Sequence, residues 1–188
     1  MPPPEPGAPR RTVSDLLRWS YANLAMAHAA LVEGATRYAP RHYAIRSKIH
    51  AGLRDGTMSI GPLADDERLK LVLPIACCYC GARENLTTDH LIATSRGGPD
   101  AGDNLVWACR SCNSAKGARD ALAWLERRGE FPPLLLLRRY LKLAFQLCAP
   151  LGALEQAPEE APQLPIELAR VPQKYPAPSE LRLWVTPL

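Results

Sequence analysis

Apolar residues recur at helical spacing in several stretches of the chain, and this pattern predicts a protein that is helical on both sides of a differently built centre. Ser14 can cap a first helix, whose apolar face includes Leu17 and Leu24 and which we expect to end near Gly34. A second, basic helix is predicted over residues 41–54. A short helix is predicted around residues 65–70, before the chain reaches its centre.

The most apolar helix is predicted over residues 134–147, after a turn that contains Pro132 and Pro133. Its charged residues, Arg138, Arg139 and Lys142, are expected on another side than the apolar stripe. A stripe this apolar needs a partner to cover it. Two partners fit the sequence, the N-terminal helix of the same chain and a second chain.

Prolines gather at the two ends of the chain and predict irregular segments there. The residues from Pro150 onward are expected to form an extended tail, in which Leu181–Val185 alternates enough for an edge strand or a docking peptide. The predicted division is a flexible Pro-rich arm, an N-terminal helical region, a central domain, a C-terminal helix and a Pro-rich tail, over residues 1–11, 12–74, 75–129, 130–149 and 150–188.

The centre contains two Cys-x2-Cys pairs, Cys77 with Cys80 and Cys109 with Cys112. Two such pairs can complete a closed four-cysteine site of the structural zinc kind. Two disulfides, or four unrelated core cysteines, are the alternatives. The 28 residues between the pairs exceed the usual zinc-ribbon spacing, so a further structure is expected inside the metal site. Cys78 and Cys148 fit neither pair, and we expect them to be unliganded thiols.

The residues between and after the two pairs carry a recognisable motif. It consists of Asp89-His90, Gly97-Gly98, Asn104-Leu105, and Cys112-Asn113-Ser114-Ala115-Lys116. This segment of about forty residues resembles the HNH endonuclease family, whose ββα-metal unit sets a catalytic site between a two-stranded ribbon and a helix. The last position of the family motif is His, whereas this chain has Asn113 there. The fold class expected is therefore α+β, a small zinc-stapled ββα-metal core flanked by N- and C-terminal α-helices with Pro-rich tails.

The residue types suit hydrolysis of a phosphodiester, in which a base deprotonates water and a cation stabilises charge on the phosphate. His90 is the nearby side chain whose ordinary pKa suits the role of general base. The resemblance implies that Asp89 and Asn113 hold the cation. Oxygen ligands favour a hard ion such as Mg2+, and Mn2+ is expected to substitute. Because neighbouring strand residues face opposite ways, Asp89 and His90 require a bend or bulge to share one pocket.

The family pattern also implies a supporting role for Asn104, which would bond across the loop and keep the catalytic groups at their spacing. His90 needs an acceptor for its other ring nitrogen, and we expect a backbone carbonyl of the loop. Four basic residues near the motif are candidates for contact with phosphates or, equally, for solvated surface charges: Arg96, Arg110, Lys116 and Arg119. Lys116 matches a family position.

Charge and composition change this picture little. A net charge of +4 and a pI near 8.8 fit a nucleic-acid partner without showing one. In the basic segment 41–54, the interleaved tyrosine and basic residues can lie along a phosphate backbone or form a solvated helix face. We expect no signal peptide, because the first residues lack a basic region followed by an apolar run. We expect no membrane span, because charges interrupt the apolar stretches. The cytoplasm is then the expected compartment, where thiols stay reduced.

The sequence therefore predicts a cytoplasmic, zinc-stapled HNH endonuclease that cuts DNA with a Mg2+-class ion. The resemblance implies 5′-phosphate and 3′-hydroxyl ends and one strand cut per event. Two alternatives remain open. One is a catalytically silent, zinc-held DNA-binding module. The other is a nuclease subunit of a larger assembly, such as an antiviral defence or phage system, in which the helical flanks contact a partner protein or a second copy of the chain.

Overall fold

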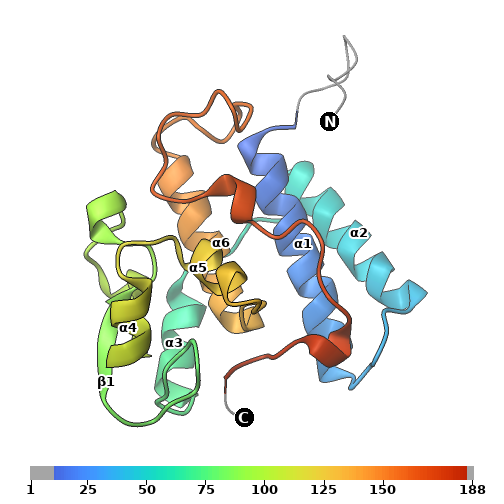
Figure 1. The fold of residues 1–188 in the computed structure, drawn as a ribbon. Coiled ribbons are helices and arrows are strands. Elements are labelled where there is room, and N and C mark those ends of the chain that lie inside the picture. The colour runs from blue at the N-terminus through green and yellow to red at the C-terminus, as the bar shows by residue number, and fades with distance from the viewer. Residues whose placement is uncertain (1–10, 186–188) are drawn as a thin grey trace.

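The computed structural model describes residues 11–185, which fold into α-helices packed beside a two-stranded antiparallel sheet (Figure 1). This architecture confirms the predicted α+β class. In chain order the elements are α1 Val13–Val32, α2 Pro40–Arg54, α3 Ala64–Val72, β1 Leu86–His90, β2 Leu105–Cys109, α4 Arg110–Lys116, α5 Ala121–Arg127 and α6 Leu134–Cys148. Within the described range, every helix is too short or too polar to cross a bilayer.

The N-cap of α1 lies two residues earlier than the sequence predicted. Thr12, not Ser14, is the N-cap. Its side chain accepts a hydrogen bond from the Asp15 amide, and the Asp15 carboxylate accepts one from the Thr12 amide at 3.0 Å. This reciprocal pair satisfies two amides that the helix itself leaves without partners. Ser14 is buried in the first turn instead. The helix ends at Val32, close to Gly34, which takes a left-handed φ of 66°.

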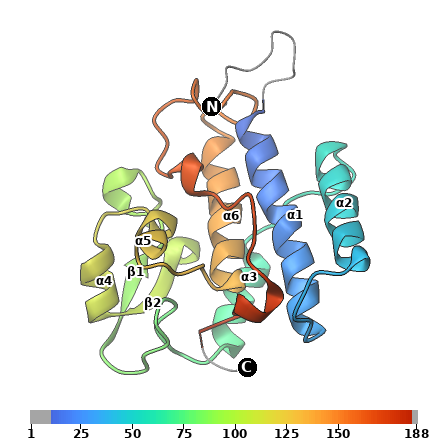
Figure 2. The same cartoon turned by 45° about the vertical axis from the view of Figure 1, so that its right-hand side comes forward.

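Helix α6 lies beside α1, and α2 covers the opposite side of α1 in both views (Figures 1 and 2). Leu137 and Leu141 of α6 are fully buried in the same core cluster as Leu17 and Leu24 of α1. The apolar stripe of α6 is therefore covered within the chain, which is one of the two partners that the sequence allowed. We refer to α1, α2 and α6 as the helical layer.

The charged residues of α6 correct a sequence expectation. Arg139 and Lys142 were predicted away from the apolar side, yet both are buried, with 5% and 2% of their surface exposed. Lys142 Nζ lies 2.6 Å from Asp66 Oδ2 of α3, and Arg139 pairs with Glu67 of the same helix. Buried cations require such partners because removal from water is costly. The ion pairs thus fasten α3 to α6.

The C-terminal tail follows the helical layer rather than standing away from it. Residues 150–185 contain little regular structure, but Ile166 and Val171 are buried in the main core. No strand forms at Leu181–Val185, contrary to one expectation. Instead, the carbonyls of Arg182 and Leu183 accept hydrogen bonds from the first two amides of α6, at 2.9 and 3.1 Å. These amides lack partners inside the helix. Most of the predicted N-terminal arm, residues 1–10, lies outside the described residues.

The two strands and α4 form a separate corner of the molecule (Figure 2). β1 pairs with β2 in a regular antiparallel register, from Leu86 opposite Cys109 to His90 opposite Leu105. Helix α4 follows β2 directly and ends at Gly117, whose φ is 54°. Asp120 then caps α5 by accepting from two of its amides. This sequence of ribbon, helix and turn brings the polar motif residues to one side.

Candidate active site and metal centre

Four cysteines from three segments converge at the base of the ribbon. Cys77 and Cys80 lie in the turn before β1, Cys109 ends β2 and Cys112 is in the first turn of α4. Their sulfur atoms all lie within 4.8 Å of one another, and those of Cys80 and Cys109 are 3.7 Å apart. A tetrahedral zinc site with bonds of about 2.3 Å places sulfurs about 3.8 Å apart. None of the four is in a disulfide. The cluster therefore fits a structural zinc ion.

The local backbone favours the thiolate at one cysteine of this cluster, Cys109, whereas burial raises the pKa of Cys80 and of Cys112. The Cys112 amide donates to the Cys109 sulfur at 3.4 Å, and this hydrogen bond lowers the pKa of the Cys109 thiol. Thiolates, not thiols, are metal ligands. Outside the cluster, burial raises the pKa of the Cys78 thiol well above its ordinary value and that of Cys148 to about 11. Both therefore stay protonated thiols at neutral pH, in line with the sequence expectation.

Asp89 is buried and already has polar partners. The Tyr79 hydroxyl donates to Asp89 Oδ2 at 2.7 Å, and Lys116 Nζ lies 3.1 Å from Oδ1 and 3.0 Å from Oδ2. The side chains of Asp89 and Lys116 are 6% and 1% exposed. Lys116 also donates to the His90 carbonyl at 2.9 Å. The Lys116 ammonium thus neutralises the Asp89 carboxylate, and a phosphate would have to compete with these internal partners to reach it.

His90 closes β1 and is only partly covered. Its Nε2 lies 2.9 Å from Asp100 Oδ1, so a carboxylate occupies the position where we had expected a backbone carbonyl. The strand shows no bulge up to the pairing of His90 with Leu105, and the chain bends at the next two residues, so of the expected bend or bulge only the bulge is absent. Asp89 and His90 nevertheless line the same hollow of about 190 Å³, with α4's end on the other side. Its remaining lining residues are Ala93, Thr94, Ser95, Gly117 and Ala118.

Asn104 is completely buried and joins the two ends of the loop between the strands. Its Oδ1 accepts from the Ile92 amide at 2.9 Å, and its Nδ2 donates to the carbonyls of Ile92 and Pro99, each at 2.8 Å. Asn104 and Ile92 are both buried, so their polar groups are withdrawn from water, where an unpaired group is costly. Asn104 therefore fixes the loop that connects His90 to Asp100. The bonds run across the loop, as the sequence analysis expected.

The loop also fits tightly against itself at Gly98. A Cβ placed there would lie 2.0 Å from the Ile92 carbonyl oxygen, a backbone atom that cannot move aside. Only glycine permits this approach. Steric fit thus explains Gly98 of the motif, and a left-handed φ of 96° explains Gly97, in the same loop that Asn104 closes.

Asn113 lies on α4 across from β1. Its Nδ2 donates to the Thr88 carbonyl at 3.2 Å, which orients the amide and leaves Oδ1 as an acceptor. Of the other basic candidates, Arg119 folds back onto the carbonyls of Ala115 and Lys116, and Arg96 contacts the Pro165 carbonyl at 3.2 Å. Arg110 is exposed.

Three contacts of this site were not found from the sequence. Tyr79 and Asp100 bond to the two central motif residues, and the helical flank holds the loop through Arg139, whose Nη1 donates to the Asp103 carbonyl at 2.8 Å. Tyr79 lies between the first two cysteines, and this position was the one available signal for it. Asp100 and Arg139 carried no signal, because the former reads as a loop residue and the latter as a surface charge.

Comparison with protein families matches residues 77–119 to the family described as HNH endonuclease. No curated protein and no solved structure matches the chain. The matched segment begins at the first cysteine of the cluster, contains both strands and α4, and ends at Arg119. We call residues 77–119 the HNH unit. This segment of the chain, with four cysteines that can hold a zinc ion, is similar to the HNH endonuclease family.

Proposed function

We propose that the protein is a metal-dependent endonuclease that hydrolyses phosphodiester bonds of DNA at the hollow beside His90. The observation that carries this proposal is the placement of His90 and Asp89 on one hollow, with the His90 ring oriented by Asp100. The family of the HNH unit supports nuclease activity in general. A four-cysteine zinc site needs thiols that stay reduced, and we therefore propose the cytoplasm.

His90 would act as the general base. When Nε2–H donates a hydrogen bond to the Asp100 carboxylate, Nδ1 keeps a free lone pair that can accept a proton from water. The carboxylate also favours the imidazolium that forms after the proton transfer. Neutral imidazole is a suitable base near pH 7. His90 would then deprotonate the water that attacks the phosphorus atom, in line with the departing 3′ oxygen.

Asp89 and Asn113 would hold the catalytic cation, with Mg2+ the best candidate. The Asn113 amide offers its Oδ1, because Nδ2 is already donated to the Thr88 carbonyl. Each Asp89 oxygen can accept more than one contact, so the bonds from Tyr79 and Lys116 do not exhaust the carboxylate. Two oxygen donors of this kind suit a hard divalent ion. Bound there, such an ion supplies stabilisation of the negative charge on the phosphate and the leaving oxygen.

The remaining motif residues would support these groups rather than react. Asn104 would hold the loop so that Asp100 stays in reach of His90. Lys116 would hold the Asp89 carboxylate in place. Arg96, Arg110 and Arg119 lie on the segments that surround the hollow or the zinc cluster and would contact phosphates of the substrate.

The test is incubation of the purified chain with supercoiled plasmid and Mg2+, scored for nicked and linear product, with a chelator control. We expect nicked circles first, since one base and one cation cut one strand. His90→Ala should abolish nicking while about one zinc ion per chain is retained. Asp100→Ala should slow turnover by about tenfold or more, and Asp100→Asn, which keeps an acceptor oxygen, should recover part of the loss. Arg127→Ala, at an exposed site on α5, is the matched control.

Equal nicking by wild type and His90→Ala would remove His90 from the mechanism. Nicking that persists in the presence of the chelator would show that catalysis does not need the cation. Activity confined to RNA under the same conditions would contradict the substrate that we propose.

A further inference from the structure

The positive charge of this chain is concentrated in one short segment. Residues 35–54 contain five Lys and Arg residues and no Asp or Glu, against a net charge of +4 for the whole chain. The rest of the chain therefore nets −1, which is 4 minus 5. The five cations are Arg37, Arg41, Arg46, Lys48 and Arg54.

The HNH unit, by contrast, has almost no net attraction for a polyanion. It contains five Lys and Arg residues and four Asp and Glu residues, a net charge of +1. Four thiolates around a Zn2+ ion add about two negative charges, so the zinc-loaded unit is close to −1. Non-specific affinity for DNA comes mainly from cations that neutralise phosphates. The HNH unit alone is poorly equipped to supply it.

Helix α2 presents its cations outward. Its apolar side, with Leu53 and Gly52 buried, packs against α1, whereas Arg41, Lys48 and Arg54 are exposed. Arg37, in the segment before the helix, is exposed as well. Among the described residues, Arg37 and Lys48 make no ion pair with a carboxylate, so their charges are available to a partner.

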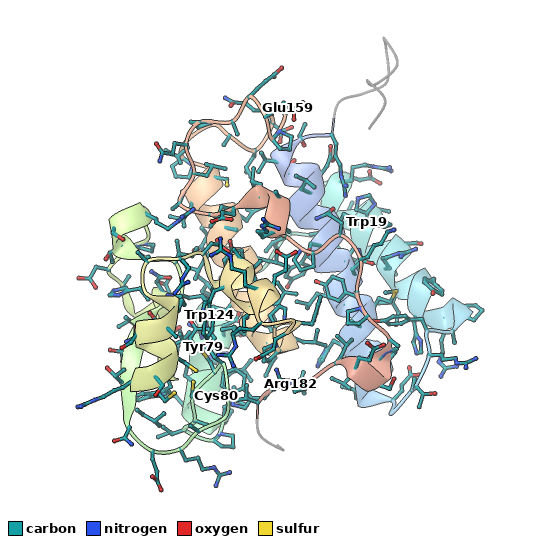
Figure 3. The ribbon with its side chains drawn as sticks, viewed as in Figure 1. Trp19, Tyr79, Cys80, Trp124, Glu159 and Arg182 are labelled. Atoms are coloured by element: carbon teal, nitrogen blue, oxygen red, sulfur yellow. The ribbon has the colours of Figure 1, made fainter. Side chains whose placement is uncertain are left out.

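Aromatic rings hold the cation at the centre of this surface. The Arg46 guanidinium lies 4.7 Å from the ring centre of Trp19 and 5.1 Å from that of Tyr43. Trp19 lies on the side of α1 that faces α2 (Figure 3). It also meets the His50 ring edge-on at 5.0 Å. Tyr43 remains 42% exposed, with a ring face that a sugar or an unpaired base can contact.

Cations of α1 approach the same place. The pKa of His50 is lowered by burial and by the neighbouring charges of Arg54, Arg11 and Arg18, and is opposed only in part by Asp15. Arg54 comes from the end of α2, Arg18 from the first half of α1, and Arg11 from the position just before the α1 N-cap. The two helices therefore add their positive fields on one surface around Trp19 and His50.

We propose that α2, the segment before it and the facing turn of α1 form the principal phosphate-binding surface for duplex DNA. We call it the α2 surface. It rests on the proposed function, because DNA is the substrate proposed for the HNH unit. The α2 surface would supply sequence-independent affinity, and the HNH unit would supply the cut. The two lie at opposite sides of the molecule, with α1 and α6 between them (Figures 1 and 2).

The chemistry of the α2 surface fits nucleic acid better than a membrane. A helix that binds a bilayer interface needs an exposed apolar face, with large side chains such as Trp, Phe or Leu. The apolar face of α2 is instead covered by α1, and Ala44, Ser47 and Lys48 are exposed. Cations spaced along an exposed helix, with a stacked arginine among them, suit a phosphate backbone.

The test measures binding without cleavage. The full chain with His90→Ala and its zinc, in the absence of Mg2+, is titrated with a duplex of about 30 base pairs, roughly three helical turns, at several salt concentrations. The test variant adds Arg37→Ala, Lys48→Ala and Arg54→Ala. The matched control adds Arg68→Ala, Arg127→Ala and Lys174→Ala, which are equally exposed and remove the same charge. Each set contains one arginine paired with a nearby aspartate, Arg54 with Asp55 and Arg68 with Asp65.

We expect the test variant to bind at least about tenfold more weakly at low salt, with the slope of log affinity against log salt reduced by about 2 to 3 units. The control should stay within about twofold of the parent, and thermal unfolding should show that both variants are folded. Equal losses in the two variants would overturn the α2 surface. So would a loss seen with single-stranded RNA or anionic vesicles but not with the duplex, or absence of salt-dependent binding by the parent.

This outcome is separable from that of the proposed function. Plasmid nicking by the wild-type chain tests catalysis, whereas the binding assay contains neither His90 nor Mg2+. Nicking that is normal in wild type, with no difference between the two variants in binding, would overturn the α2 surface alone. Absence of nicking by the wild-type chain, together with the expected difference in binding between the two variants, would overturn the proposed catalytic function alone.

Discussion

The HNH unit and the helical layer are held together by different forces. In the helical layer, α1 and α6 bury leucines against each other, and the tail covers their outer side. In the HNH unit, the central groups are polar: a buried Asp89 with Lys116, a buried Asn104, and four cysteines that can share a zinc ion. Catalysis needs polar groups that stay in place, and apolar packing alone cannot hold them. Metal ligation and saturated hydrogen bonds do so here.

The two regions are nevertheless joined. Tyr79, which bonds to Asp89, packs edge-on against Trp124 of α5 with ring centres 5.0 Å apart (Figure 3). From the other side, Arg139 of α6 and Lys70 of α3 donate to the carbonyls of Asp103 and Gly102, next to Asn104. The helices thus restrain the ends of the loop that carries the candidate catalytic groups. Variants that destabilise one region at a time should show how strongly the helices restrain the loop of the HNH unit.

The largest effect is expected from removal of zinc. Structural zinc contributes an apparent 10–16 kcal/mol in small zinc-dependent units, so a strong chelator or Cys112→Ser should unfold the HNH unit and abolish nicking. The helical layer, with its own apolar core, should keep most of its helical circular dichroism signal. Amide hydrogen exchange, measured by mass spectrometry with and without zinc, would separate the two responses. Cys148→Ser, at a buried thiol outside the cluster, is the control that should keep zinc and activity. Complete loss of helical signal on chelation would contradict the comparison.

A second large effect is expected in the helical layer. Leu141→Ala removes a fully buried side chain of α6, and such truncations cost about 2–5 kcal/mol through lost burial and the cavity left behind. Urea unfolding should show this loss, while metal analysis still finds about one zinc ion per chain. Leu151→Ala, at a side chain that is 49% exposed, is the matched control and should cost far less. Release of zinc by Leu141→Ala would mean that the two regions unfold as one.

A smaller effect, confined to the HNH unit, is expected from Asn104→Ala. This change leaves the Ile92 amide and the Ile92 and Pro99 carbonyls without their partner, at about 1–3 kcal/mol for each group that stays buried. Exchange in the loop should accelerate and nicking should slow, whereas α1 and α6 should stay protected. Asn113→Ala should reduce nicking without this loosening, because its amide bonds to the Thr88 carbonyl at the surface of the ribbon. Unchanged amide hydrogen exchange in the loop of Asn104→Ala would contradict the role of Asn104 in supporting the loop.

The smallest effect concerns the junction between the regions. Despite partial burial, which raises it, the pKa of Glu67 is lowered overall by hydrogen bonds from Arg139 and Lys70. A carboxyl whose folded pKa lies below its unfolded value stabilises the fold above the unfolded value, and this contribution is lost as pH falls through the folded one. The stability difference between wild type and Glu67→Gln should therefore be largest near pH 6 and shrink below about pH 4. Urea midpoints across this range would check the sign, and a difference that grows on acidification would contradict it.

Local spacing made the HNH unit predictable from the sequence. Two Cys-x2-Cys pairs bring four sulfurs together almost regardless of what surrounds them, and Asn104 and Gly98 serve one loop of fixed length. The apolar periodicity of α6 was equally informative, since a helix with such a stripe must be covered. These predictions needed only neighbours in the chain or a single tertiary partner.

What the sequence did not reveal depends on contacts between distant segments. Arg139 and Lys142 resemble surface charges, and only α3, more than sixty residues earlier, shows why they are buried. Asp100 resembles any acidic loop residue until the loop folds back on His90. The choice of Thr12 over Ser14 as N-cap depends on a contact between the start of α1 and the C-terminal tail, in which the Ser14 amide donates to the Leu154 carbonyl.

The hydrogen bonds from the first amides of α6 to the carbonyls of Arg182 and Leu183 limit how the chain can be shortened. A fragment that ends after α6 would expose the first amides of that helix and the leucines beside them. A fragment limited to the HNH unit would lose Trp124, Arg139 and Lys70 together. Expression of the unit for spectroscopy should therefore retain residues through at least 185, and solubility should fall in steps as each supporting segment is deleted.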